Sequence, residues 1–393
     1  MVIRDWSSDV CSSDLAMAWD PATPVPAGTT LESPLAGLDA IPRADLFGAG
    51  AYNLAVFRTG WRPDSTVVSL RAGDFQVHHA HYTAGTFTID KFAPLAILSG
   101  QYTGYGLGGH RESYYIQSVS ANCPLILMPG EHLATTYHYD LPNVNTGGQR
   151  LIMPTGSDVL STVQWRRNTR PGQPWAAGKI IAYAWSTEGL GYVAVDLTCA
   201  YNSTCFAWPG QQPKLSRAVR AMVVLDDPET ILVYDRVTAL SADYTKKWLL
   251  HCINKPVAAG EKILKGDAGN GILETRDPTL DIVNGPGRLA VRALLPTRMR
   301  WLMIGGPDYK YYVETDGDQS KGFDGINAVK GVGGRREVHY FDDGDWRLEL
   351  EPLQPAQTHD LLVAMLPGSS HSPPRVAPRI IGQAPRYVGV QAG

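Results

Sequence analysis

The sequence has no apolar run long enough to cross a membrane and no excess of positive charge. A membrane-spanning helix needs about 18 or more consecutive apolar residues, and the 393-residue chain contains no such stretch. Lys and Arg number 35 against 38 Asp and Glu, so the formal net charge is −3. No broad basic field is therefore present to hold nucleic acid. We expect neither a membrane span nor a nucleic-acid partner, and an anionic ligand would need a local cationic site.

Cysteine is also scarce. The chain has five Cys residues and no C-x-x-C pair, so a zinc site built from cysteines is not expected. Cys199 and Cys205 bracket a short polar loop, AYNST. They can form a disulfide in an oxidising compartment or remain two free thiols, and the sequence leaves both possibilities open.

The first residues do not belong with the rest of the chain. Residues 5–15, DWSSDVCSSDL, match the translation of a common sequencing adapter at all eleven positions. A natural Ser- and Asp-rich loop is the alternative interpretation. We exclude residues 1–15 from the fold, as we would a cloning scar. We expect the natural N-terminus to lie upstream, together with any signal peptide or further domain.

Long stretches with the 3.6-residue periodicity of amphipathic helices are hard to find, whereas strand-like runs recur from about residue 50. Runs such as STVVSLRAG, GTFTIDKF, GYVAVDLT and DLLVAML alternate with turn signals such as GPG and DDGD. This texture predicts an all-β fold, with a large antiparallel β-sandwich over 49–300 and a smaller C-terminal β region over 301–393. SRAVRAMVV is helix-like, but its β-branched end favours a strand. Residues 16–48 are rich in Pro, Ala and Gly and indicate a linker.

Three histidines stand close together in VHHAHYTAGTFTID, residues 77–90. If this segment is extended, its side chains alternate between two faces. The odd-numbered residues, His79 and His81 among them, then share one face, and the even-numbered residues, His78 among them, share the other. Two histidines at i and i+2 can converge on a metal or on a bound substrate. A polar patch on a sheet is the alternative.

Five segments in and after this stretch carry a family resemblance: HAHYTAGTF, APLAILSGQY, YYIQSVSAN, VDLTCAY and RAVRAMVVLDDPETILVYDRV. In the same order, they resemble H-x-H-x-D-x-G-x-F, A-P-L-A-I-D-S-G-x-Y, Y-Y-x-R-T-I-A-H-N, D-x-T-x-A-Y and R-x-x-R-x-x-V-x-L…D-R-V of the heparinase II/III-like polysaccharide lyases. The resemblance runs from about residue 50 to 367. It implies the supersandwich-type β-sheet part of such a lyase, which in the family follows a helical toroid.

The resemblance also implies a reaction, β-elimination. A base removes the C5 proton of a uronic acid while the adjacent carboxylate is neutralised, and the C4–O bond breaks to leave an unsaturated sugar. Because that proton is weakly acidic, a positioned base and stabilisation of the developing charge are both needed. In the family a Tyr and a His come from the helical domain, and the first His of H-x-H reaches in from the sandwich. Residue matching gives this role to His79. The alternative is that His79 is only a surface histidine without a role in the reaction. We also expect His78 and Tyr102 to bind substrate.

The family's zinc site is altered in this sequence. The second His of H-x-H, here His81, is a zinc ligand in the family, together with the Asp of D-S-G and the His of A-H-N. Those two positions are Leu98 and Ala121 here, and neither side chain can coordinate zinc, which typically takes three or four N, S or O ligands. Thr83 and Gln117 replace further polar residues of the motifs. We therefore expect the zinc site to be lost and no cofactor to be bound.

Two further features have simple interpretations. Asp235 and Arg236, in YDRV, are expected to form a structural ion pair. His251, in WLLH, fits either the buried end of a strand or a site residue.

The sequence thus predicts the C-terminal part of a polysaccharide lyase that cleaves a uronic-acid-containing polysaccharide such as heparan sulfate or alginate. Without the helical domain, the chain is expected to be nearly inactive. The expected partner is an acidic polysaccharide, and the expected location is periplasmic or extracellular. The alternative is a non-catalytic carbohydrate-binding or structural β-sandwich module.

Overall fold

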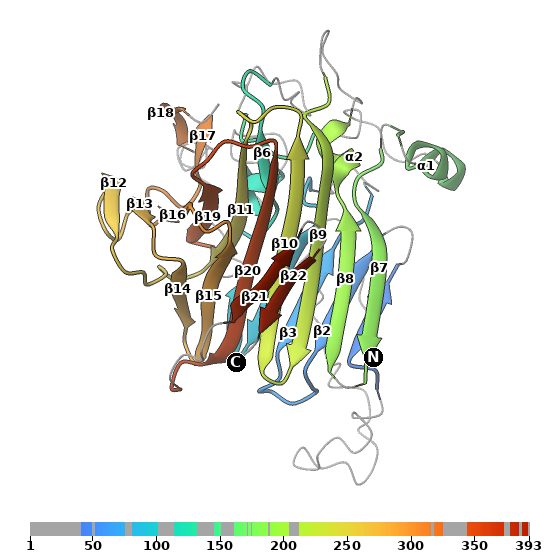
Figure 1. The fold of residues 1–393 in the computed structure, drawn as a ribbon, viewed down its shortest axis with the longest axis horizontal. Helices are drawn as coiled ribbons and strands as arrows, with labels where there is room; N and C mark the ends of the chain where they lie inside the picture. The colour runs from blue at the N-terminus through green and yellow to red at the C-terminus, as the bar shows by residue number, and fades with distance from the viewer. Residues whose placement is uncertain are drawn as a thin grey trace, which may run out of the picture.

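The computed structural model describes residues 41–48, 52–74, 81–100, 114–131, 145–150, 161–170, 172–173, 175–187, 189–203, 212–315, 318–324, 344–372, 378–384 and 387–391. In Figure 1 long strands stand side by side in stacked layers, with the two short α-helices near one end of them. The structure is mostly β, with antiparallel sheets in a sandwich-like arrangement. This confirms the fold class predicted from the strand-like runs.

The largest sheet has seven strands, all antiparallel to their neighbours. In spatial order they are β14 (Thr279–Asn284), β15 (Gly287–Leu295), β20 (Thr358–Ser369), β10 (Glu229–Ala239), β9 (Leu215–Asp226), β8 (Leu190–Asp196) and β7 (Lys179–Ser186). Along β10 buried and half-buried residues alternate, as expected when one face of a strand packs on the core. SRAVRAMVV lies in β9, which confirms the strand predicted there.

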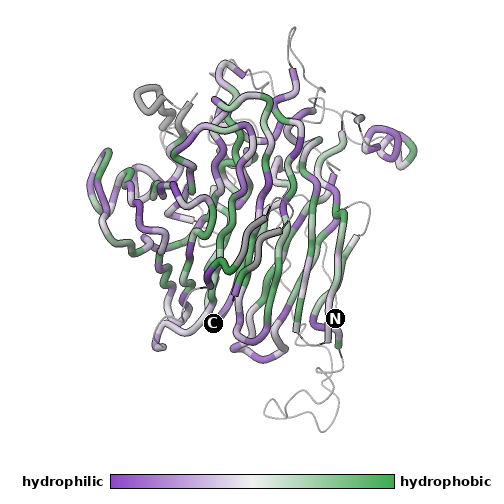
Figure 2. The backbone as a smooth tube through the Cα atoms, viewed as in Figure 1, coloured by the Kyte–Doolittle hydropathy of each residue, from purple (hydrophilic) through white to green (hydrophobic). Residues whose placement is uncertain are grey.

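Two further sheets complete the layers. The six-stranded sheet contains β12 (Lys262–Gly266), β13 (Gly271–Thr275), β16 (Met299–Gly305), β19 (Trp346–Pro352), β11 (Thr245–Cys252) and β6 (Leu125–Leu127). The five-stranded sheet contains β1 (Ala44–Phe47), β2 (Leu54–Arg58), β3 (Val67–Arg71), β4 (Thr86–Lys91) and β5 (Ala93–Ala96). A single hydrophobic cluster joins all three sheets, with Phe87, Val233 and Trp248 among its members. Figure 2 shows hydrophobic residues along the central strands and hydrophilic residues at many of the turns.

The boundary predicted at residue 300 falls inside β16. The later strands β19 and β20 lie in the interior of the six-stranded and seven-stranded sheets. Two hairpins remain outside these sheets, β17 (Tyr312–Thr315) with β18 (Asp318–Asp324), and β21 (Arg379–Ala384) with β22 (Tyr387–Gln391). Ile380 and Val390 of the second hairpin pack against Leu294 and Leu362 of the large sheet, and Figure 1 shows the hairpin lying over β20 and β10.

The helices within the described ranges are few and short. α1 (Thr162–Asn168) begins at a Ser161 cap, whose hydroxyl accepts a 3.1 Å hydrogen bond from the backbone N–H of Gln164. α2 (Thr198–Asn202) follows β8, and a 3-10 turn, η3, covers Ser118–Ser120. In the part of the chain that the structure describes, no helix is long and apolar enough to cross a membrane.

Candidate functional site

Among the described residues, the strand predicted over residues 77–90 is wrong for residues 81–85. β4 begins only at Thr86, and residues 81–85 form a turn. Gly85 has a φ of +87°, and a Cβ there would lie 2.6 Å from Leu197 Cδ1, so the turn needs a glycine. The predicted alternation of faces therefore does not extend to His81. His78, His79 and Tyr102 lie outside the described residues.

The structure nevertheless brings the histidine motif and its partner motifs together. The His81 ring meets the Tyr115 ring edge-on, with 4.5 Å between the ring centroids. The backbone N–H of Tyr82 donates to the Ile116 carbonyl over 2.9 Å, and that of Ser99 donates to the Ser120 carbonyl over 2.8 Å. Segments that start at residues 81, 97 and 114 thus contact one another.

The three positions that match the zinc ligands of the resembled motifs lie in these three segments. His81 is only 9% exposed, Ala121 is fully buried and Leu98 is half-buried. Among the described residues, no group of three or more His, Cys, Asp or Glu side chains is placed to hold a metal ion. The predicted loss of zinc rests on the chemistry of Leu98 and Ala121, because neither side chain has a ligand atom.

Two buried polar side chains, those of Ser118 and Gln149, form hydrogen bonds with the backbone just after His81. The Ser118 hydroxyl donates to the Tyr82 carbonyl over 2.6 Å. The Gln149 amide accepts from the Ala84 N–H over 3.1 Å and donates to the Ala84 carbonyl over 2.6 Å. The Gln149 N–H in turn donates to the Ser118 hydroxyl over 2.8 Å. Gln149 lies outside every quoted motif, so no pattern in the sequence marks it.

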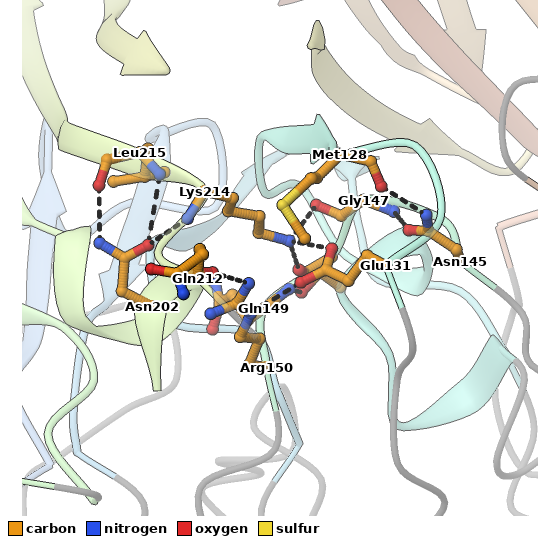
Figure 3. Close-up of polar contacts among 12 residues, drawn as sticks. Met128, Glu131, Asn145, Gly147, Gln149, Arg150, Asn202, Gln212, Lys214 and Leu215 are labelled. Atoms are coloured by element: carbon orange, nitrogen blue, oxygen red, sulfur yellow. Dashed lines mark hydrogen bonds and ion pairs between the residues drawn. The ribbon is translucent and has the colours of Figure 1, made fainter. Parts of the chain in front are cut away.

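Next to Gln149 lies a group of three buried charges, Glu131, Arg150 and Lys214, which we call the charged cluster (Figure 3). Arg150 Nε donates to Glu131 Oε1 over 2.7 Å, and Lys214 Nζ donates to Glu131 Oε2 over 2.9 Å. Lys214 Nζ also donates to the Gly148 carbonyl over 2.7 Å. The cluster therefore joins the segment around Glu131 and the 145–150 segment to the start of β9.

The charged cluster carries one more positive than negative charge. Burial lowers the pKa of the Lys214 ammonium, and the charge and hydrogen bond of Glu131 oppose that shift. Arg150 Nη1 is buried and has no hydrogen-bond partner among the described residues. No signal in the sequence could have revealed this cluster, because Lys214 and Glu131 are 83 positions apart and belong to no motif.

Asp74 is a second candidate that no motif in the sequence marks. It is the last described residue before the segment that contains His78 and His79, and it is 5% exposed. Burial raises its pKa to about 6, although a 2.8 Å hydrogen bond from the Ala177 N–H and the charge of Lys179 oppose the shift. A carboxyl group with this pKa can exchange a proton near neutral pH.

The predicted pair of Asp235 with Arg236 is wrong. Asp235 instead forms a two-point ion pair with Arg220 on β9, and both hydrogen bonds are 2.7 Å long. Arg220 Nη1 also donates to the carbonyls of Gly85 and Asn122. Arg236 lies on the opposite face of β10, where its Nε is 3.8 Å from Asp360 Oδ1. The side chains of successive residues of a strand point to opposite faces. Asp235 and Arg236 therefore lie on different faces of the sheet and have different partners.

His251 proves to be a fully buried residue near the end of β11. Its Nδ1 lies 3.1 Å from Asn122 Oδ1, and its Nε2 lies 3.0 Å from the Val119 carbonyl oxygen. Burial, reinforced by the charge of Arg347, lowers its pKa to about 3. The ring is therefore neutral in the folded protein and can donate to only one of its two acceptors.

His251 should make the fold sensitive to acid. The unfolded chain binds a proton at this residue near pH 6.5 and the folded protein only near pH 3, so stability falls as pH is lowered through this window. We expect His251 alone to remove about 2 kcal/mol by pH 5. Urea unfolding at pH 7 and pH 5 should show a smaller pH dependence for His251→Gln than for the wild type. The same change at exposed His371 is the control, and equal slopes for His251→Gln and the wild type would contradict the assignment.

Comparison with solved structures gives the following likenesses. The chain matches a crystal structure of heparinase III with 14% identity and a TM-score of 0.45, over 82% of this chain and 36% of that one. It matches a heparan sulfate lyase from Pedobacter heparinus with 15% identity and a TM-score of 0.38, over 86% of this chain and 37% of that one. A putative aldose 1-epimerase from Escherichia coli K12 matches with 9% identity and a TM-score of 0.33, over 81% of this chain and 100% of that one. No family model and no curated protein matches the chain. The chain thus spans about a third of the length of the two lyases.

Proposed function

We propose that the chain is the β-sheet part of a polysaccharide lyase that cleaves a uronic-acid-containing polysaccharide by β-elimination. The observation that carries this proposal is the direct contact between motif residues far apart in the sequence. Arg220, which is paired with Asp235 of the same motif, donates to the Asn122 carbonyl of another motif and to the Gly85 carbonyl that follows the histidines. The segments with the lyase-like sequences are therefore also the segments that hold one another in place.

In this proposal His79 contacts the substrate carboxylate or moves the C5 proton. An unperturbed imidazole titrates near pH ~6.5, so both forms are available near neutrality. The remaining catalytic groups, a Tyr and a His, would come from sequence upstream of the sandwich. A periplasmic or secreted protein is proposed as well, because export fits an acidic polysaccharide substrate.

Replacing His79 by alanine should reduce elimination strongly. We expect the initial rate on a uronic-acid polymer to fall by about 100-fold, the lower end of what a positioned acid or base contributes. The measurement is the ultraviolet absorbance of the unsaturated product, made on the protein that includes its upstream sequence. His371→Ala, at an exposed position, should keep the wild-type rate. An unchanged rate in His79→Ala would contradict the role given to His79.

A carbohydrate-binding module without catalysis is the second candidate. Leu98 and Ala121 favour it, because loss of a structural metal can accompany loss of activity. The two candidates differ in one outcome. Binding of the polymer without any unsaturated product, in the protein with its upstream sequence, supports the module, and turnover supports the lyase. The chain alone should be nearly inactive in both cases.

A further inference from the structure

We infer that the charged cluster of Glu131, Arg150 and Lys214 is a binding site for one small monovalent anion, a carboxylate or a halide. The inference does not rest on the proposed function. Arg150 Nη1 is buried, and among the described residues it has no hydrogen-bond partner. The rest of the guanidinium is engaged, because Nε donates to Glu131 and Nη2 donates to the Gln212 carbonyl over 2.7 Å. The unused N–H groups of Nη1 are the donors that an anion would accept from.

The charged cluster is positive by one unit. Lys214 Nζ donates to Glu131 Oε2 over 2.9 Å, and it also donates to the carbonyls of Gly148 and Gly147 over 2.7 Å and 3.4 Å. Only the protonated ammonium has three N–H donors, and arginine stays protonated in proteins. Within the described part of the chain, no second carboxylate pairs with either cation. One carboxylate therefore faces two positive charges.

One negative charge would make the charged cluster neutral. Burying an uncompensated charge is costly, and the side chains of the cluster are at most 3% exposed, so water compensates little. Arginine N–H groups form charge-assisted hydrogen bonds with carboxylates, and a halide can accept in the same way. A dianion such as sulfate would leave the cluster negative by one unit. The excess charge thus selects a monovalent anion.

The charged cluster lies next to surface residues. Glu131 follows exposed Pro129 and Gly130, and Gln212, whose carbonyl accepts from Arg150, is exposed as well. A Cβ built on Gly130 would have no heavy atom within 4 Å, so the space beside this residue is open. Figure 3 shows the side chains of Arg150 and Lys214 both reaching Glu131. Solvent is closest on the side of Gly130 and Gln212, where an anion would enter.

A second group of the same three residue types provides a contrast. Lys247 and Arg347 both pair with Glu349, over 2.7 Å and 2.8 Å. There the Lys247 side chain is 13% exposed and in contact with water, and the Tyr114 hydroxyl acts on Arg347. The Lys214 side chain, in contrast, is fully buried. The second group therefore needs an anion less and serves as an internal control.

Chloride is the probe for the test, and the measurement is the line width of its chlorine-35 NMR signal, which broadens when the ion binds to a large molecule. In the wild-type chain we expect a saturable broadening from one site. Arg150→Met leaves a neutral Lys214–Glu131 pair. The dissociation constant of chloride should then rise about 10-fold or more, because a charge-assisted hydrogen bond and the excess charge are both lost. Lys214→Met leaves a neutral Arg150–Glu131 pair and should also raise it. Lys247→Met, the matched control, should keep the wild-type value.

The inference is overturned if the wild-type chain shows no saturable broadening. It is also overturned if a folded Arg150→Met protein binds chloride as tightly as the wild type, which is the result expected of a purely structural ion network. If Arg150→Met does not fold, the comparison of Lys214→Met with Lys247→Met decides. Equal dissociation constants in those two variants would then refute the site.

Competition identifies the source of the anion. Acetate and glucuronate are added to the chloride-bound chain, with glucose as the neutral control. Displacement by both carboxylates shows that the site takes the carboxylate of an acidic sugar, and displacement by acetate alone assigns it to small free anions. Chloride that neither displaces restricts the site to halides, whereas displacement by glucose would contradict an anion site. None of these measurements involves elimination, so a failure of the proposed function leaves their result unchanged.

Discussion

Replacing Asp235 by asparagine should lower the free energy of unfolding by about 3–5 kcal/mol, the usual effect of removing one partner from a buried ion pair. Both Asp235 oxygens accept from Arg220, and both side chains are at most 1% exposed. Asparagine leaves the guanidinium charge without a counter-charge and turns an N–H₂ group toward Arg220 Nη2 or Nε. Burial tends to lower the pKa of Arg220, but Asp235 raises it above its ordinary value. An arginine does not lose its proton in a protein, so the loss should be the same from pH 6 to pH 10.

Asp360→Asn is the matched control for this change. Asp360 lies on β20, next to β10, and its ion pair with Arg236 is partly exposed and 3.8 Å long. Exposed pairs of this kind contribute at most about 1 kcal/mol, so the control should lose little. Denaturant unfolding of the three proteins measures both values. A loss below about 1 kcal/mol in Asp235→Asn would show that the pair does not hold the motif segments together.

Replacing Glu131 by glutamine should also lower the free energy of unfolding by about 3–5 kcal/mol at neutral pH. Glu131 is fully buried and is the acceptor for both Arg150 and Lys214, so two cations would remain buried without a counter-charge. Here the loss should depend on pH, because a lysine can lose its proton. Without Glu131, the pKa of Lys214 in the folded state falls further below its unfolded value of 10.5. The unfolded state then binds more protons, and the variant regains stability as pH rises toward 10.

Two further variants make this prediction specific. Glu261→Gln breaks the partly exposed pair with Lys255 and should cost less than about 1 kcal/mol at any pH. Adding Lys214→Met to Glu131→Gln should recover part of the loss and remove its dependence on alkaline pH. A pH-independent loss in Glu131→Gln would contradict the assignment of a buried, charged Lys214.

The sheets could be predicted from the sequence because local pattern determines most of their strands. Runs such as TILVYDRVTAL alternate between apolar and polar residues and became β10, with bounds close to those expected. The histidine segment was harder to predict. Gly85 ends the alternation with a left-handed turn. A glycine is needed there because a Cβ would collide with Leu197, which lies 112 positions further along the chain. No local signal reports such a contact.

The candidate site was predictable only where short motifs mark it. The motif residues Asn122, Arg220 and Asp235 do contact one another. The sequence suggested Arg236 as the partner of Asp235, whereas the partner is Arg220. Gln149 and the charged cluster could not be predicted from the sequence. The role of a Gln or a Glu depends on the partners that the fold brings near it, and those partners are far away in the sequence. A single Gln in GGQR has no periodicity, spacing or composition that separates it from a surface residue.

The central claim is that this sandwich serves an elimination reaction, and substrate chemistry offers its most direct test. β-Elimination needs the uronic carboxylate to make C5–H acidic, whereas hydrolysis of the same linkage does not. The protein with its upstream sequence should therefore produce ultraviolet-absorbing chain ends from a native uronic-acid polymer. It should produce none from the same polymer after its carboxylates have been reduced to alcohols. Cleavage of both polymers with saturated ends, or binding of the native polymer without cleavage, would contradict the account.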